Sequence, residues 1–116
     1  MTLLARVHEE RRDDLPLAAI SGEVDASNIV EVAERLRSLL TNRSTALVVD
    51  LTDTGYLDSA GINLLFELSA ELVARQQALR LVVPAASPLT RMFQIAGLSG
   101  AIPTYETREA ALAGQA

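Results

Sequence analysis

The chain has 116 residues, of which 49% are hydrophobic and 22% charged, and its formal net charge is −5 at pH 7. These values are typical of one soluble globular domain spanning residues 1–116, and the acidic balance argues against nucleic acid or an anionic membrane as a partner. No apolar run approaches the ~18 residues that cross a bilayer, the N-terminus lacks signal-peptide character, and there is no cysteine, so we expect a cytoplasmic protein without disulfides.

The first three predicted elements are two strands and a helix. Segments 3–7 and 17–21 form a hairpin around the charged run "HEERRDDLP", which is typical of a solvated turn. A helix follows in "GEVDASNIVEVAERLRSLLTN", with Ser27 or Asn28 as its cap. Its apolar residues share one face, as amphipathic helices require: Ile29, Ala33, Leu36 and Leu40.

The rest of the chain alternates strands and helices. Segments 45–51 and 79–83 are nearly all apolar and indicate buried strands, and 59–76 indicates the helix between them. Ser87, Pro88 and Gly97 suit the N-cap, first position and C-terminal end of another helix. A last strand over 101–105 and a short helix after Thr107 complete the order β-β-α-β-α-β-α-β-α. The sequence therefore predicts an α/β domain with a mixed, mostly parallel sheet, an antiparallel opening hairpin and about four helices.

Several catalytic and ligand-binding classes lack the residues that they need. The only histidine is His8 and "DSAG" is not the G-x-S-x-G elbow, which excludes the usual serine hydrolase triad. All basic residues are arginine, so a P-loop is excluded, and the glycines do not form a dinucleotide fingerprint. We expect no metal site of the His and Cys kind and no cofactor.

Acidic residues near predicted strand ends suggest one further class. A phosphoaspartyl receiver gathers carboxylates at this edge to hold Mg²⁺, and the chain carries Asp25, Asp50, Asp53 and Asp58 there. Receivers also use a lysine and begin with a strand that leads into a helix, whereas this chain has no lysine and begins with a hairpin. We therefore interpret Asp50 and Asp53 as structural or solvated.

Ser59 lies where the second main helix begins and has two interpretations. In the first, Asp58 caps the helix and Ser59 only occupies its first turn. In the second, the hydroxyl is presented to a partner. The neighbouring residues favour an open, apolar docking platform, because two are small and two are aliphatic: Ala60, Gly61, Leu57 and Ile62. Glycine at a helix start costs roughly 0.5–1 kcal/mol, which a purely structural cap does not explain.

Three segments in order resemble one known family. "YLDSAGI" after "LVVDL" resembles the phosphorylation segment of STAS domains, specifically of bacterial anti-sigma factor antagonists. "ISGEVDASN" and "SPLTRMFQIAGLSGAIPTYETREAAL" are similar to two further parts of that family, so the resemblance runs from about Leu4 to Leu112. Ala60 stands where many members have a second serine, which leaves Ser59 as the hydroxyl of the motif.

The resemblance implies a STAS-type fold and a switch without catalysis of its own. The unphosphorylated protein would bind an anti-sigma factor that is also an ATP-dependent serine kinase, and so release a sigma factor. Phosphorylation of Ser59 would end the complex, and a serine phosphatase would restore it. Asp25 would lie near the acceptor serine and matter for phosphorylation; alternatively it caps the first helix. The residues implied in partner binding surround the two loops: Gly22, Glu23, Asp25, Leu57, Asp58, Ser59, Ala60, Gly61 and Ile62. The competing interpretation is a STAS scaffold or ligand-binding module without a phosphorylation cycle.

Overall fold

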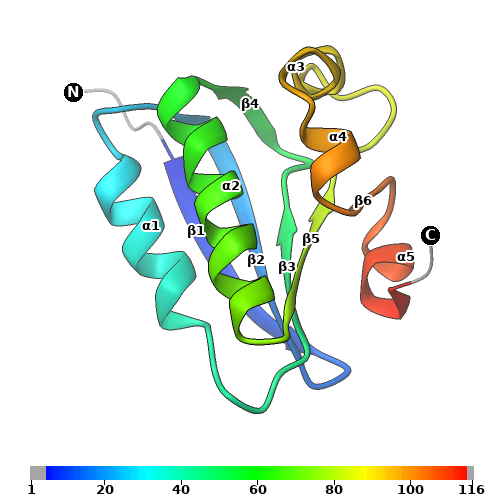
Figure 1. The fold of residues 1–116 in the computed structure, drawn as a ribbon. Helices are drawn as coiled ribbons and strands as arrows, with labels where there is room; N and C mark the ends of the chain where they lie inside the picture. Colours follow the sequence, from blue (N-terminus) through cyan, green and yellow to red (C-terminus); the bar gives the residue numbers. More distant parts are fainter. Residues whose placement is uncertain (1–4, 115–116) are drawn as a thin grey trace.

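The computed structural model describes residues 5–114, which form a six-stranded sheet and five helices (Figure 1). In chain order the elements are β1 (Ala5–Arg12), β2 (Leu15–Val24), α1 (Ile29–Ser38), β3 (Ala46–Asp50), β4 (Thr54–Leu57), α2 (Ser59–Ala74), β5 (Ala78–Val82), α3 (Leu89–Ala96), α4 (Leu98–Ala101), β6 (Thr104–Tyr105) and α5 (Arg108–Ala113). The strands are ordered β1-β2-β3-β5-β6, and β4 pairs with β2. Only β1 and β2 are antiparallel, which confirms the predicted mixed sheet with an antiparallel opening hairpin.

The hairpin is longer than predicted, because its strands run through the charged segment that we expected to be a turn. The reversal consists of Asp13 and Asp14, whose φ angles are 53° and 65°. Acids of β1 find partners instead of water alone: Glu9 pairs with Arg35 of α1 at 2.8 Å. Part of the predicted first strand, residues 3 and 4, lies outside the described residues.

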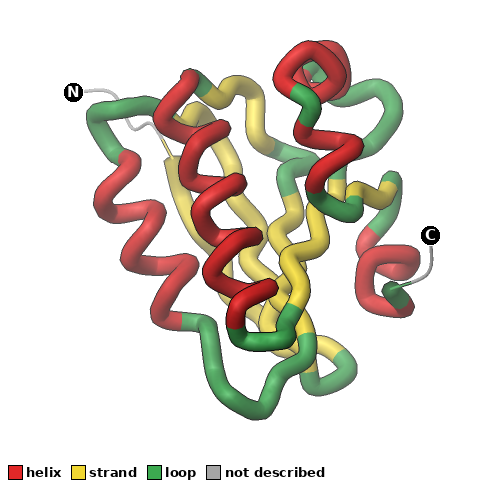
Figure 2. The backbone as a smooth tube through the Cα atoms, in the orientation of Figure 1, coloured by secondary structure: helices red, strands yellow, loops and turns green. Residues whose placement is uncertain are grey.

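Helices cover both faces of the sheet. Helices α1 and α2 lie side by side on one face (Figure 2), where they bury the larger apolar cluster together with residues such as Ala18 and Val49. Alternate residues of the same strands point to the other face of the sheet. There Leu17 and Val48 pack with Ala111 of α5. All five residues of β3 are buried, as expected for a central strand covered on both sides.

Two elements near the functional end differ from the prediction. The sequence did not predict β4, a four-residue strand that continues the line of β3 along β2. The predicted strand over 101–105 is mostly not a strand. The N–H of Ile102 donates to the carbonyl of Leu98 at 2.9 Å and so closes the helical turn α4, which leaves two residues for β6. The helices therefore number five among the described residues, where we expected about four.

The predicted ends of α3 are confirmed at Gly97 and shifted by one residue at the start. Gly97 adopts φ 74° after α3, as predicted, but the N-cap is Pro88 rather than Ser87, and the helix begins at Leu89. The hydroxyl of Ser87 still accepts from the N–H of Leu89 at 3.0 Å. The short helix α5 begins after Thr107 as predicted, and Thr107 caps it by accepting from the N–H of Ala110.

Candidate functional site

Ser59 is the first residue of α2, and it is exposed. Asp58 precedes it as the N-cap residue, with extended backbone angles of φ −87° and ψ −171°. Strand β4 leads directly into this cap, so the serine lies at the carboxyl end of a parallel strand. Ligands and partners of α/β sheets commonly bind at such an edge.

The segment before Ser59 is held by the sheet. The buried hydroxyl of Thr54 donates to the carbonyl of Ile20 at 2.7 Å, and the N–H of Asp58 donates to the carbonyl of Val24 at 3.1 Å. The register of the β2–β4 ladder shifts beside Gly22, whose φ of 97° favours glycine. Ser59 is therefore presented by a hydrogen-bonded strand rather than by a free loop.

Asp58 connects the two candidate segments. Its Oδ1 accepts from the N–H groups of Ala60 (2.9 Å) and Gly61 (3.1 Å), which caps α2 as predicted. Its Oδ2 accepts from the N–H of Ala26 at 3.1 Å. The loop that contains Asp25 therefore lies against the start of α2, and the structure brings the "GEVDAS" and "LDSAG" segments together.

Asp25 organises its own loop. Its Oδ1 accepts hydrogen bonds from both the hydroxyl and the N–H of Ser27, and these bonds, the hydroxyl first, lower the pKa of Asp25. Asn28 occupies the N-cap of α1 without a side-chain cap; its Oδ1 instead accepts from the N–H of Asp25, and its Nδ2 donates to the carbonyl of Glu23. The alternative in which Asp25 caps the first helix is therefore not what the structure shows.

Two of the predicted contact residues are buried. Leu57 is 3% exposed, and Gly61 is buried beneath it. A Cβ at Gly61 would lie 3.0 Å from Leu57 Cδ2 and 3.5 Å from Val24 Cγ1. The glycine that seemed to open a platform is thus required by close packing of α2 on the sheet, and both residues support the surface from below.

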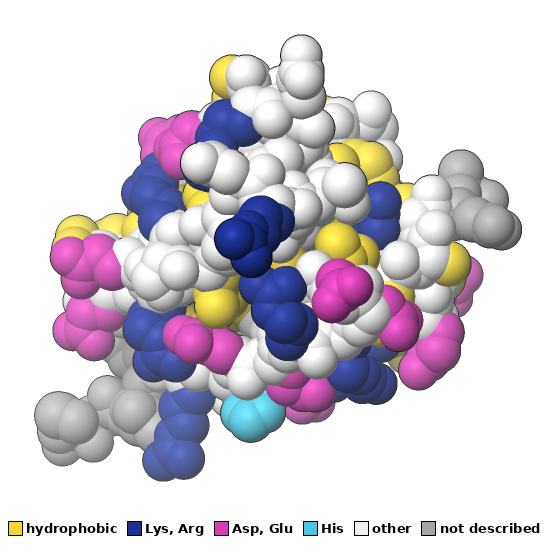
Figure 3. All heavy atoms as spheres, turned by 90° about the horizontal axis from the view of Figure 1, so that it is seen from below, with side chains coloured by type: hydrophobic (Ala, Val, Ile, Leu, Met, Phe, Trp, Pro, Cys, Tyr) yellow, Lys and Arg dark blue, Asp and Glu magenta, His cyan; other side chains and the backbone are white. Residues whose placement is uncertain are grey.

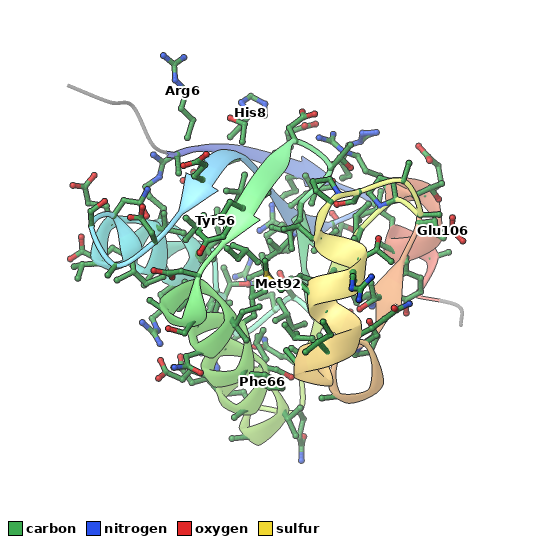
Figure 4. The ribbon with its side chains drawn as sticks, turned by 90° about the horizontal axis from the view of Figure 1, so that it is seen from above. Arg6, His8, Tyr56, Phe66, Met92 and Glu106 are labelled. Carbon is green, nitrogen blue, oxygen red and sulfur yellow. The ribbon has the colours of Figure 1, made fainter. Side chains whose placement is uncertain are left out.

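The accessible surface around Ser59 is partly apolar. Ala60 and Ile62 are partly buried, whereas Gly22 and Glu23 are exposed. Tyr56 of β4 is 45% exposed. Seen from above, Tyr56 lies on β4, and Met92 and Phe66 lie between α2 and α3 (Figure 4).

Our reading of the sequence missed two exposed apolar residues at this end. These are Tyr56 itself and Val30, which is 68% exposed in the first turn of α1. Tyr56 begins the segment "YLDSAGI" that also contains Ser59, so its position in the sequence could have indicated a place near the site. Val30 does not lie on the predicted apolar face of α1. An apolar residue at a solvent-facing position of a helix could have indicated a contact surface.

The remaining acids do not form a receiver-type pocket. Asp50 is 4% exposed, and its carboxylate is neutralised by Arg108 and accepts from the N–H and hydroxyl of Thr52. Asp53 is exposed, and His8 lies exposed on the edge strand, 3.7 Å from Glu10. Asp50 is thus structural and Asp53 solvated.

Two kinds of feature are absent from residues 5–114, a metal-binding cluster and a helix suited to cross a membrane. No group of three or more His, Cys, Asp or Glu side chains is arranged to hold a metal ion there. Across the same residues, no helix combines the length and apolar character that crossing a membrane requires.

Comparison with known proteins decides the family. The pattern of the STAS domain matches residues 7–111. The chain belongs to the STAS domain family. This match covers the two loops, β4, α2 and the α3–α5 region, and it confirms the resemblance that the three sequence segments indicated.

Relatives within this family carry regulatory names. The anti-sigma-B factor antagonist of Listeria monocytogenes is 29% identical over 102 residues, which cover 88% of each chain. The crystal structure of an anti-sigma factor antagonist from Mycobacterium paratuberculosis superposes with a TM-score of 0.80 at 23% identity, over 95% of this chain and 92% of that one. Unphosphorylated SpoIIAA has a TM-score of 0.71 at 21% identity, over 92% and 93% of the two chains, and the phosphorylated form from Bacillus has 0.65. These names describe regulatory binding proteins rather than enzymes.

Proposed function

We propose that the protein is an anti-sigma factor antagonist whose contact with an anti-sigma factor is ended by phosphorylation of Ser59. The observation that carries the proposal is an exposed serine in the first turn of α2, held in place by Asp58 and β4. The names of the relatives support the antagonist role, and SpoIIAA has been solved both with and without phosphate. The kinase would be the anti-sigma factor itself, of the ATP-binding type, a serine phosphatase would reverse the reaction, and the cycle would operate in the cytoplasm.

The geometry favours a phosphate that leaves the fold intact. The Ser59 side chain makes no hydrogen bond within the described residues, so its modification breaks no internal contact. The N-terminal end of a helix favours negative charge by about 0.3–1 kcal/mol. The nearby carboxylates of Asp58 and Asp25 oppose the new charge. These terms are comparable in size, so we expect the phosphorylated domain to remain folded.

The switch would act at the docking surface. We define this surface as the exposed or partly exposed residues at this end: Gly22, Glu23, Asp25, Val30, Tyr56, Ser59, Ala60 and Ile62. Phosphoserine carries about −1.5 to −2 charges, and burying such a group without a partner costs several kcal/mol. Reversing occupancy from 99:1 to 1:99 takes about 5.5 kcal/mol, which a centrally placed phosphate can supply.

Phosphorylation is tested by mass. The full chain is incubated with the candidate anti-sigma kinase and ATP, and we expect an increment of about 80 Da that peptide mapping assigns to Ser59. Ser59→Ala should abolish the increment, whereas Ser99→Ala, at an exposed serine of α4, should retain it. A partner that binds the wild-type chain but adds no phosphate would favour the scaffold interpretation.

Binding is tested separately with the same partner. Ser59→Ala should bind like the wild-type chain, because the change removes one hydroxyl that makes no hydrogen bond within residues 5–114. Ser59→Asp places a single charge at the docking surface and should weaken binding by roughly tenfold or more in calorimetry. Equal affinities for Ser59→Asp and the wild-type chain would contradict a central position for this serine.

A further inference from the structure

A cleft of about 830 Å³ lies at the end of the sheet opposite Ser59. It opens between the β1–β2 turn and the loop that joins α1 to β3, and we call it the basal cleft. Its lining combines two arginines with three neutral polar residues and one acid: Arg11, Arg43, Thr41, Asn42, Ser44 and Asp14. We propose that the basal cleft binds a small multivalent anion, a molecule with two or more phosphate or carboxylate groups, with Arg11 and Arg43 as its counter-ions.

The first argument is uncompensated charge. The chain has 15 acidic and 10 basic residues, yet neither Arg11 nor Arg43 forms an ion pair within residues 5–114. Four arginines do pair with acids, for example Arg37 with Glu71 at 2.6 Å. Other arginines also lack an ion pair within residues 5–114, so what distinguishes Arg11 and Arg43 is that both line one cleft. Figure 3 looks onto the basal end and shows arginine side chains meeting at the middle of the face, with acidic side chains around them.

The arginines are also available for new bonds. Arg11 uses one N–H of Nη1 to donate to the backbone carbonyl of Asp14 at 2.8 Å, which orients its guanidinium and leaves its other donors for a ligand. Guanidinium groups bind phosphate and carboxylate through paired hydrogen bonds. The carboxylate of Asp14 also lines the cleft and offsets part of the positive charge. The lining still keeps a net positive charge, and a ligand with two anionic groups can pair with both guanidinium groups where a monovalent anion pairs with one.

The second argument is that hydrogen bonds hold one side of the cleft, the loop of residues 41–44, in a fixed conformation. Gln77, in the connection between α2 and β5, donates from Nε2 to the carbonyls of Thr41 (2.6 Å) and Ser44 (2.7 Å) and so holds the loop in place. Arg75 donates to Asn42 Oδ1 at 3.0 Å and fixes the same loop from the side. A loop held in this way has little conformational entropy left to lose when a ligand binds.

The cleft has room for a small molecule. Small-molecule sites commonly occupy about 300–1,000 Å³, and the basal cleft falls in this range. A single inorganic phosphate would leave most of the cleft to water. Because Arg11 and Arg43 line the same cleft, the ligand class that uses both arginines carries two anionic groups. This site is independent of the Ser59 switch.

The experiment is an NMR titration of the ¹⁵N-labelled full chain at constant ionic strength. Pyrophosphate and citrate represent the phosphate and carboxylate sources, and acetate is the monovalent control. We expect saturable shifts in residues 11–14 and 41–44 with one or both multivalent anions, and not with acetate. The anion that binds more tightly identifies the source.

Three variants test the assignment. The double substitution Arg11→Gln, Arg43→Gln should weaken binding by roughly tenfold or more, and Arg11→Lys, Arg43→Lys should recover part of it. The double substitution Arg6→Gln, Arg91→Gln removes the same two charges from exposed arginines that form no ion pair within residues 5–114, and it should leave affinity unchanged. An absence of saturable shifts at millimolar anion would overturn the proposal. So would an equal loss in this control, because binding would then follow net charge alone. Thermal unfolding of each variant shows that a loss of binding is not a loss of fold.

Discussion

The N–H of Ala26 donates a hydrogen bond to Asp58 Oδ2 across 32 residues of sequence, at 3.1 Å. The other oxygen of the same carboxylate caps α2. One side chain therefore fixes the Asp25 loop and the start of the serine helix relative to each other. A partner that contacts both segments therefore depends on the Asp58 carboxylate for their relative position, even if the partner does not contact Asp58 itself.

Two substitutions separate the roles of Asp58. Asp58→Ala removes the cap and should lower the free energy of unfolding by about 1–2 kcal/mol in chemical denaturation. Asp58→Asn keeps a capping oxygen, so the free energy of unfolding should change little. Its NH₂ group cannot accept the hydrogen bond from the N–H of Ala26. In this variant the Ala26 amide should nevertheless exchange hydrogen faster than in the wild-type chain. Unchanged Ala26 exchange in Asp58→Asn would show that the bond between the loops contributes nothing.

The pKa of Asp25 should depend on Ser27. The hydroxyl of Ser27 is the first cause of the lowered pKa, so Ser27→Ala should raise the pKa toward the ordinary value of about 3.9. Because the folded-state pKa lies below the unfolded one, this carboxylate stabilises the fold above its ordinary pKa. That contribution is lost as pH falls through the lowered value. A carboxyl ¹³C titration by NMR measures the shift, with Ser99→Ala as the unchanged control; identical midpoints in Ser27→Ala and the wild-type chain would refute the assigned cause.

Packing at Gly61 should limit the size of its replacement. In Gly61→Ala, better helix propensity gains about 1 kcal/mol, while the new methyl group meets Leu57 Cδ2 at 3.0 Å, so the two effects should nearly cancel. Gly61→Val should cost about 1–3 kcal/mol through overpacking. Gly100 of α4 is the control, since a Cβ there meets nothing within 4 Å and Gly100→Ala should not destabilise. Thermal denaturation checks all three, and a fully stable Gly61→Val would remove the packing explanation.

The ion pair of Asp50 and Arg108 should stabilise the packing of α5 on the sheet. Arg108→Gln leaves the buried Asp50 carboxylate with only the donors of Thr52, and we expect a loss of about 2–3 kcal/mol in the free energy of unfolding. Glu10 pairs with the same guanidinium at 3.0 Å, but it is more exposed, so Glu10→Gln should cost less than about 1 kcal/mol. Similar losses in both variants would argue against a special role for burial.

Sequence patterns predicted the elements whose signals are local. The buried strand β3, the amphipathic helices, the cap at Asp58 and the C-terminal glycine of α3 follow from neighbouring residues alone. The strand β4 could not be found in this way, because "TGYL" is short and becomes a strand only by pairing with β2. The charged run of β1 was misread for a related reason: its acids are neutralised by arginines distant in sequence, such as Arg35 and Arg108.

The candidate site was predicted in its residues but not in its connections. Ser59 and Asp58 were identified from a helix-start pattern and from the family resemblance. The bond from Ala26 to Asp58 and the inward packing of Gly61 depend on tertiary structure, which spacing along the chain does not encode. The same limit applies to the burial of Asp50.

The strand β4 has one consequence for the enzyme that would modify this protein. Under the proposed function the kinase would meet Ser59 on a folded surface, because β4 is hydrogen-bonded to β2 and leads directly into α2. A synthetic peptide with the sequence "GYLDSAGIN" would lack this folded surface and should be a poor substrate. The kinase would therefore have to contact the folded surface around Ser59. Its substrate specificity would then depend more on that three-dimensional surface than on the local sequence.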